Sequence, residues 1–282
     1  MKAYKFFLLT LVFIVLSSCT TKFLYNQLDR LIIWRVDQFV NLTDGQKQQF
    51  KGDLRAYLDL ARKEQIPILA YEAKKTSQLL ESKKLPLQSI QKISGRVTNE
   101  IDNLITSAVP LLVNLLSQLD PSQKLELFES LKNFRNKTYN IYSGETAEER
   151  VEKSNRMTFK TIERFIGRLD QSQEIIIQDS LNKMADTSED WIAYQAVWQE
   201  NLFALIDERP MQKEYELRLK QLLVNPSNLY SKEYQRRIDV NAGIMLQMTT
   251  SLIKSLNEKQ IKKAKSKLNE YSTTLTRLAE SS

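Results

Sequence analysis

The chain has 282 residues, with 41 Lys and Arg, 34 Asp and Glu, no His and one Cys. Without His, it has no imidazole for a nucleophile pair, a general base or a haem ligand. With a single Cys, it can form neither an intrachain disulfide nor a Cys/His zinc site. Six Gly and six Pro are too few for a turn-dense all-β fold. We therefore predict a protein without a metal site or a cofactor.

The first residues have the features of an export signal. Lys2 and Lys5 precede an almost uninterrupted apolar run, residues 6–16. A membrane-spanning helix needs roughly 20 apolar residues, whereas this shorter run has the size of a signal-peptide core. The segment Leu16-Ser17-Ser18-Cys19 then resembles the bacterial lipobox, in which the Cys is lipidated. The alternatives are a plain secretory signal with a chance Cys, or a short buried helix.

The lipobox resemblance implies several properties of the mature chain. The signal peptide is residues 1–18, and Cys19 carries a thioether diacylglycerol and a palmitate-like N-acyl chain. More than one acyl chain gives a stable membrane anchor. Thr20, where inner-membrane lipoproteins tend to have Asp, implies the outer membrane and its periplasmic face. The partners expected are the membrane, through Cys19, and an envelope protein or anionic lipid, but no nucleic acid.

Residues 19–41 are predicted to form the lipid anchor and a membrane-proximal helix. No Gly-, Ser- or Pro-rich spacer follows Cys19, and residues 23–34 already show helical periodicity. We interpret Tyr25 and Trp34 as core or rim residues of a helical domain. The alternative is contact with the membrane interface, where such rings are enriched.

Helical periodicity continues through the rest of the chain, and no segment shows sustained strand alternation. One stripe ends before Pro67 and a second before Pro86, and a long helix over 87–118 should be kinked or broken at Pro110. The last predicted helix has a heptad seam typical of bundle packing. We predict an all-α, elongated multi-helix bundle of about ten helices. After a helix that ends near Ser143-Gly144, the later ones are expected at about 146–168, 171–186, 188–208, 211–223, 228–255 and 257–279.

Four helices begin with one pattern. A Leu precedes a capping residue, Thr, Asp or Asn, and a Gln lies three positions after it. This is a capping box, in which the cap side chain accepts from the amide of the Gln and the Gln side chain reaches back to the cap amide. The four segments are Leu42-Thr43-Asp44-Gly45-Gln46, Leu119-Asp120-Pro121-Ser122-Gln123, Leu169-Asp170-Gln171-Ser172-Gln173 and Leu256-Asn257-Glu258-Lys259-Gln260.

The order of these motifs suggests an internal duplication. The first and third are followed by similar segments, Leu69-Ala70-Tyr71-Glu72-Ala73 and Ile192-Ala193-Tyr194-Gln195-Ala196. The second and fourth follow long helices with similar endings. We therefore predict a first helical unit at 42–168 and a second at 169–282. Chance recurrence of a common capping motif is the alternative.

Two resemblances follow from these motifs. The Leu-Thr-x-x-Gln pattern, matched literally only by Leu42 to Gln46, is similar to that of the periplasmic Spy/CpxP-type proteins, which are helical chaperones or stress adaptors. The wider layout is a lipobox, a Tyr-Asn-x-Leu-Asp-x-Leu-Ile-x-Trp segment (Tyr25 to Trp34) and the Leu-Thr-x-x-Gln helix start. It resembles an uncharacterised family of proteobacterial lipoproteins, which implies no particular activity.

We expect a non-enzymatic periplasmic binding, chaperone or adaptor protein. A structural or assembly factor of the cell envelope is one alternative, and a cell-wall hydrolase is another. Glu129-Ser130 is similar to the start of the lytic transglycosylase motif, but Gly243-Ile244-Met245-Leu246-Gln247 lies far from it. We interpret the five lysines that begin the last helix as a solvated face, with contact to anionic lipid or lipopolysaccharide as the alternative. They are Lys259, Lys262, Lys263, Lys265 and Lys267.

Overall fold

The computed structural model describes residues 28–80 and 86–280. Within these ranges every regular element is helical, which confirms the predicted all-α multi-helix fold. A short 3-10 turn, Pro226–Leu229, precedes the penultimate helix. The α-helices are α3 (Leu28–Asp37), α4 (Asp44–Glu64), α5 (Ile66–Leu80), α6 (Leu87–Ser117), α7 (Pro121–Ser143), α8 (Ala147–Ile166), α9 (Gln171–Leu181), α10 (Ser188–Glu208), α11 (Gln212–Val224), α12 (Lys232–Ser255) and α13 (Glu258–Glu280).

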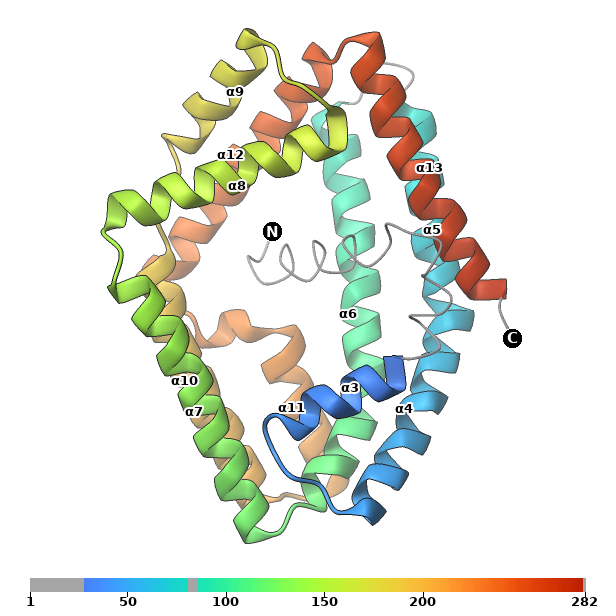
Figure 1. The fold of residues 1–282 in the computed structure, drawn as a ribbon, viewed down its shortest axis with the longest axis vertical. Coiled ribbons are helices and arrows are strands. Elements are labelled where there is room, and N and C mark those ends of the chain that lie inside the picture. Colours follow the sequence, from blue (N-terminus) through green and yellow to red (C-terminus); the bar gives the residue numbers. More distant parts are fainter. Residues whose placement is uncertain (1–27, 81–85, 281–282) are drawn as a thin grey trace.

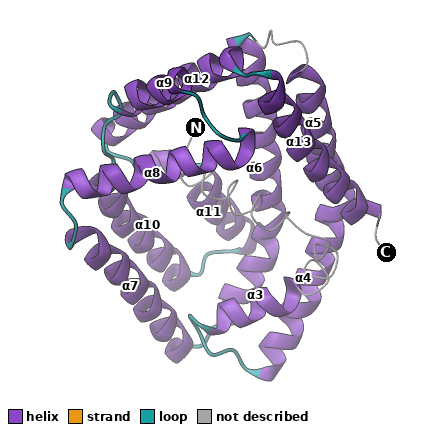
Figure 2. Ribbon diagram, turned by 45° about the horizontal axis from the view of Figure 1, so that its top comes forward, coloured by secondary structure: helices purple, strands orange, loops and turns teal. Residues whose placement is uncertain are grey.

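The helices form a frame with two long sides and two corners (Figure 1). One side pairs α7 with α10, and the other pairs α5 with α13. The lower corner in Figure 1 holds the starts of α4 and α7, and the upper corner holds the starts of α9 and α13. Helix α6 runs between the sides, and the tilted view in Figure 2 shows the same closed outline.

Each corner is built from two of the four predicted capping boxes. At the lower corner, the side-chain amides of Gln46 and Gln123 donate to each other's Oε1 at 2.9 and 2.8 Å. At the upper corner, Gln173 and Gln260 make the same reciprocal pair at 2.9 and 2.7 Å. Each Gln oxygen also accepts from the amide of its own cap residue, which confirms the predicted boxes.

The remaining N–H donor of each Gln side chain binds an equivalent acceptor at both corners. This acceptor is the backbone carbonyl of the residue that precedes the Leu of the partner motif. Because two motifs recognise each other through side chain and backbone at once, each pair fixes two helix starts together. The first motif pairs with the second and the third with the fourth, so each pair lies inside one predicted unit. The carbonyls are those of Asn41, Gln118, Arg168 and Ser255.

Small residues line the antiparallel contact between α5 and α13. Ser272 Oγ donates to the carbonyl of Ala70 at 2.9 Å, and Ser77 Oγ approaches the carbonyl of Lys265 at 3.5 Å. Ala70, Ser77, Ala264 and Ser272 are all buried. Short side chains let the two backbones come close, and the hydroxyls bond to carbonyls across the contact. The second helix of the first predicted unit therefore packs along the last helix of the second unit.

The α7–α10 side has the equivalent topology with bulkier contacts. Phe128 stacks on Phe203 with ring centroids 4.0 Å apart. Gln199 Nε2 donates to the carbonyl of Leu131 at 3.0 Å, and Lys124 Nζ donates to the carbonyl of Ile206 at 2.9 Å. These contacts run antiparallel along the two helices. Here the second helix of the second unit packs on α7, the helix of the first unit that begins with the second capping-box motif.

The hydrophobic cores cross the predicted boundary at residue 168. One core joins α8 with α9, α12 and α13, and another joins α6 and α7 with α10 and α11. A third core holds α3, α4, α6 and the start of α7 together. The two predicted units are therefore interlocked in one body, and their origin by duplication stays a prediction.

Two sequence expectations about element boundaries need correction. Helix α6 is not broken at Pro110 but continues through it, with Val109 and Leu111 buried on either side while the proline lies on the exposed face, and a kink there stays a prediction. Helix α9 ends at Leu181 rather than near 186. The Asp186 carboxylate there accepts from the amide and hydroxyl of Ser188, and this local turn competes with the helix.

Candidate functional site

The one site residue predicted from the sequence, Cys19, lies outside the described residues. The same holds for the whole predicted signal peptide and for Tyr25. In the described part of the chain, no helix has the length and apolar character needed to cross a membrane.

Helices α7 and α13 can be compared position by position, because each begins with a capping box whose Gln lies three residues after the cap. Counting 4, 11 and 18 residues from Gln260 gives Ala264, Tyr271 and Leu278 on α13. These residues lie on one face, since positions seven apart nearly superpose on a helix. Ala264 and Leu278 are buried, and Tyr271 is partly buried against the same small core as Leu278. Helix α5 covers this stripe.

The same count from Gln123 on α7 gives Leu127, Phe134 and Ile141, which we call the α7 stripe. Leu127 packs against two cores. Phe134 is 48% exposed and Ile141 is 60% exposed. An apolar stripe that begins in the core thus continues along the helix into positions that are about half exposed or more.

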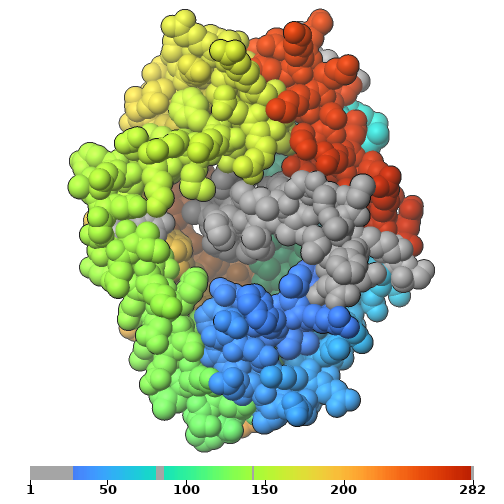
Figure 3. All heavy atoms as spheres, in the orientation of Figure 1, coloured from blue at the N-terminus to red at the C-terminus, as the bar shows by residue number. Residues whose placement is uncertain are grey.

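Residues at the end of α3 meet the middle of the α7 stripe. Phe39 packs edge-on against Phe134 with ring centroids 6.0 Å apart. The guanidinium of Arg35 lies 5.0 Å from the Phe39 ring and 6.0 Å from the Phe134 ring. Figure 3 shows this face of the molecule hollowed between α7 and α8, in green, and α3, in blue. The α7 stripe therefore combines exposed aliphatic and aromatic surface with a cation bound to the ring faces.

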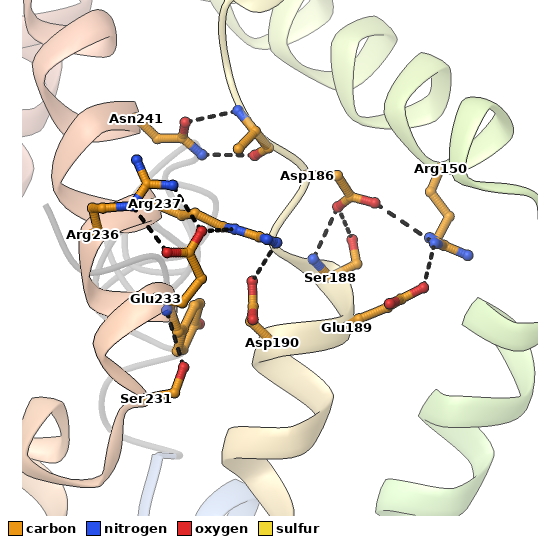
Figure 4. Close-up of polar contacts among 12 residues, drawn as sticks. Arg150, Asp186, Ser188, Glu189, Asp190, Ser231, Glu233, Arg236, Arg237 and Asn241 are labelled. Atoms are coloured by element: carbon orange, nitrogen blue, oxygen red, sulfur yellow. Dashed lines mark hydrogen bonds and ion pairs between the residues drawn. The ribbon is translucent and has the colours of Figure 1, made fainter.

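Next to the end of α7, a polar network holds the loop between α9 and α10 (Figure 4). Arg150 of α8 reaches Asp186 at 3.6 Å and Glu189 at 3.5 Å, and its side chain is only 11% exposed. From the other side, Asn241 of α12 exchanges two hydrogen bonds with the backbone of Ala185. The loop is fastened to α8 and α12 at once, so the network acts as a structural clamp.

Paired charges continue this network along α12. Arg237 bridges Asp190 at 3.2 Å and Glu233 at 2.9 Å, and Arg236 binds Glu233 through two nitrogens. The hydrogen bonds from Arg236 and Arg237 lower the pKa of Glu233 to about 2. Glu233 is therefore ionised at neutral pH and stays paired in the clamp.

Beside these charges lies a cluster of three tyrosines, Tyr194, Tyr230 and Tyr234. The Tyr230 ring contacts the other two at centroid distances of 4.8 and 4.7 Å. Burial raises the pKa of Tyr230 to about 12 and that of Tyr234 further. The cluster therefore packs as neutral phenols under the clamp.

The remaining sequence candidates are spread over the frame. Among the lysines of α13, Lys263 Nζ donates to the carbonyl of Glu163 and Lys267 pairs with Glu270 at 2.8 Å, whereas Lys259 and Lys262 are exposed. Glu129 is exposed on α7, and Gly243 lies on α12. The described ranges contain no group of three or more His, Cys, Asp or Glu side chains suited to a metal ion.

The comparisons with known proteins identify a family. Residues 38–235 match the model of a family of unknown function, DUF6279. The chain belongs to this family. The matched region includes the lower corner, the α7 stripe and the part of the clamp that precedes α12, and it ends in the first turn of α12. No curated protein and no solved structure matched the chain.

Sequence reasoning finds the apolar period of the α7 stripe, but it misses both the exposure of the stripe and the pairing of the glutamines. The stripe residues have the period of a buried helix face, so the sequence alone predicts core. The exposed stripe of α7 is recognised only when the structure is used to compare it with the buried stripe of α13, which starts from the same motif. For the glutamines, the sequence predicts the local capping boxes but not the bonds between motifs. The side-chain oxygen completes the box, and the two N–H donors remain for partners that are distant in sequence.

Proposed function

We propose that this protein is a lipid-anchored, periplasm-facing lipoprotein of the outer membrane that binds a protein partner without catalysis. The anchor is supported by the lipobox around Cys19 and the short apolar run before it. The binding role rests on one observation, the exposed continuation of the α7 stripe at Phe134 and Ile141. On α13 the equivalent stripe is covered by a helix, so an apolar helical or extended segment of a partner fits the α7 stripe.

The geometry supports a groove-type contact with a protein segment. Amphipathic segments bind such surfaces through apolar anchors spaced along one face. Aromatic and aliphatic anchors at the centre of an interface usually carry most of its binding energy. Phe134 is held by Phe39 and Arg35, so it is positioned before a partner arrives. Such positioning lowers the ordering cost of binding.

The double substitution Phe134→Ala with Ile141→Ala tests the binding role. We expect it to weaken suppression of client aggregation at least about fivefold, because two anchors of a binding surface are lost. The measurement is light scattering after dilution of a denatured client into buffer, together with in-cell photocrosslinking from position 134. The control is Leu125→Ala with Leu217→Ala, which are 59% and 57% exposed; Leu125 lies on another face of α7 and Leu217 lies on α11.

The outcomes separate the candidate functions. Equal activity of the two double variants contradicts the α7 stripe as the binding surface. A single stoichiometric crosslinked partner without client promiscuity supports a structural or assembly factor of the envelope instead. Release of muropeptides by the purified protein contradicts the non-enzymatic proposal. For the anchor, loss of acyl labelling and of membrane fractionation in Cys19→Ala is expected, and unchanged fractionation contradicts it.

A further inference from the structure

Helix α3 has two faces of different character. Its inner face carries Ile32, Ile33 and Val36, which pack on the core of α4, α6 and α7. On the opposite face, Leu31 is 46% exposed and Trp34 is 61% exposed. The exposure of Trp34 departs from the sequence interpretation of this residue as core or rim. The helix is therefore fixed from behind while presenting a large aromatic ring to the outside.

The acidic side chains of α3 are neutralised by residues of α4. Asp29 is buried and binds Arg55 Nε at 2.8 Å, and Asp37 pairs with Lys47 at 3.1 Å. Burial raises the pKa of Asp29, but the hydrogen bonds from the Arg30 amide and Arg55 outweigh it and hold the pKa below its usual value. These pairs leave the exposed face of α3 without an unpaired carboxylate.

Two exposed arginines flank the apolar residues on that face. At about 100° per residue, the order around the helix is Arg30, Trp34, Leu31 and Arg35. The apolar side chains are therefore central and the guanidinium groups lie at both edges. Among the described residues, the Arg30 side chain makes no ion pair, and Arg35 lies over aromatic rings rather than beside an acid. Such a helix suits the boundary of a bilayer, where long cationic side chains extend to the headgroups.

The position of α3 in the chain also limits where this face can lie. Nine residue steps separate Cys19 from Leu28, the first residue of α3. Fully extended, they span at most about 30 Å. With Cys19 acylated, α3 is the first described helix after the bilayer and stays close to its surface. Figure 1 shows α3 in front of the frame rather than inside it, and Figure 3 shows it on the surface of that face.

We propose that the outer face of α3 docks on an anionic phospholipid bilayer, with Trp34 and Leu31 at the interface and Arg30 and Arg35 at the headgroups. This inference rests on the proposed acylation of Cys19. Docking turns the frame so that the face shown in Figure 3 is directed at the membrane from which the lipid anchor extends. The partner surface at the α7 stripe is then held next to that bilayer.

The test uses the acylated full-length lipoprotein, reconstituted in phosphatidylglycerol–phosphatidylcholine vesicles whose acyl chains carry bromine. Bromine quenches tryptophan fluorescence only at short range. We expect quenching in the wild type that disappears in Trp34→Phe and persists in Trp191→Phe, the matched control on α10. Equal quenching of the two variants overturns the proposal.

A second measurement addresses the charges with protein that lacks residues 1–19. We expect Arg30→Gln to weaken its partition onto phosphatidylglycerol-containing vesicles about fivefold, the worth of one cation near an anionic surface. Lys220→Gln, which removes an exposed cation of α11, should leave partition unchanged. Equal effects of the two variants overturn the role of Arg30. If the acylated protein floats with vesicles but Trp34 is not quenched, the α3 proposal fails while the anchor stands; if Cys19→Ala alone leaves fractionation unchanged, the anchor fails.

Discussion

Each long side of the frame contains one helix that begins with the capping-box motif, α7 or α13, but the apolar stripes of these two helices are buried to different extents. On the α5–α13 side, small buried residues such as Ala70 and Ser272 let the helices approach, and the stripe of α13 is covered. On the α7–α10 side, large groups such as Phe128 and Phe203 fill the contact, and the stripe of α7 emerges from the core. The comparison shows that helical periodicity identifies an apolar face. Whether that face is buried within the protein depends on which helix packs next to it.

The glutamine pairs at the two corners also differ in their exposure to solvent. Gln173 is 0% exposed and Gln260 is 4% exposed, so the upper pair is shielded from water. At the lower corner Gln123 is buried but Gln46 is half-buried. Loss of the same hydrogen bonds should therefore cost more free energy at the upper corner, because water can replace a lost partner only where it has access.

The largest expected effect is at the upper corner. Gln173→Ala should lower the free energy of unfolding by about 3 kcal/mol, because it leaves buried donors and acceptors of Gln260 and Ser255 without partners. Gln46→Ala should cost about 1 kcal/mol, since water reaches that corner. Urea denaturation followed by circular dichroism measures both. The exposed neighbours Gln171→Ala and Gln48→Ala are the controls, and equal losses at the two corners would contradict the role of burial.

The equivalent positions on the two sides give the next effect. Leu278→Ala on α13 should cost about 2 kcal/mol, because a buried side chain leaves a cavity against α5. Ile141→Ala on α7 should change stability by less than about 0.5 kcal/mol, as expected for an exposed site. Thermal or urea unfolding of the two variants measures the difference. A large loss for Ile141→Ala would show that the α7 stripe is covered within the protein.

The smallest effect concerns acid, and here the corners should agree. Each corner has one aspartate cap, Asp120 or Asp170, whose pKa is lowered by the hydroxyl of Ser122 or Ser172 and then by the amide of the capping Gln. A lowered pKa stabilises the fold above the ordinary aspartate value, about 3.9, and this contribution is lost as the pH falls through the lowered folded-state pKa.

Asp120→Asn and Asp170→Asn should each flatten the loss of stability below about pH 4 to the same extent, since both carboxylates are exposed. Near neutral pH both variants should remain close to the wild type, because Asn also caps helices. Urea midpoints measured across the acid range test this. A steeper change for Asp170→Asn would indicate that burial of the upper corner extends to its cap.

Much of the fold could be predicted from local rules. Thr43, Asp120, Asp170 and Asn257 mark helix starts because a capping box depends on residues only three apart. The heptad seam of α13 was correctly interpreted as packed, and Ala264, Leu268, Leu275 and Leu278 are all buried. The all-α class follows from the same local periodicity.

The candidate site could not be predicted, because it depends on which helix lies next to which. Phe134 and Ile141 have the spacing of core residues, and only the arrangement of α10 and α3 leaves them exposed. The continuity of α6 at Pro110 is likewise decided by packing of its buried neighbours rather than by the proline itself. Cys19 is the opposite case, since its prediction rests on a processing motif and not on the fold.

The contact between α5 and α13 has a consequence for the order of folding. Helix α5 is synthesised early, but the surface that covers it and the last glutamine of the upper corner both belong to α13. A chain emerging from a ribosome or a translocation channel cannot complete either until residues 258–280 appear. Until then, Ala70 and the neighbouring carbonyls of α5 remain open to solvent, so the half-made protein is itself a substrate for holding factors.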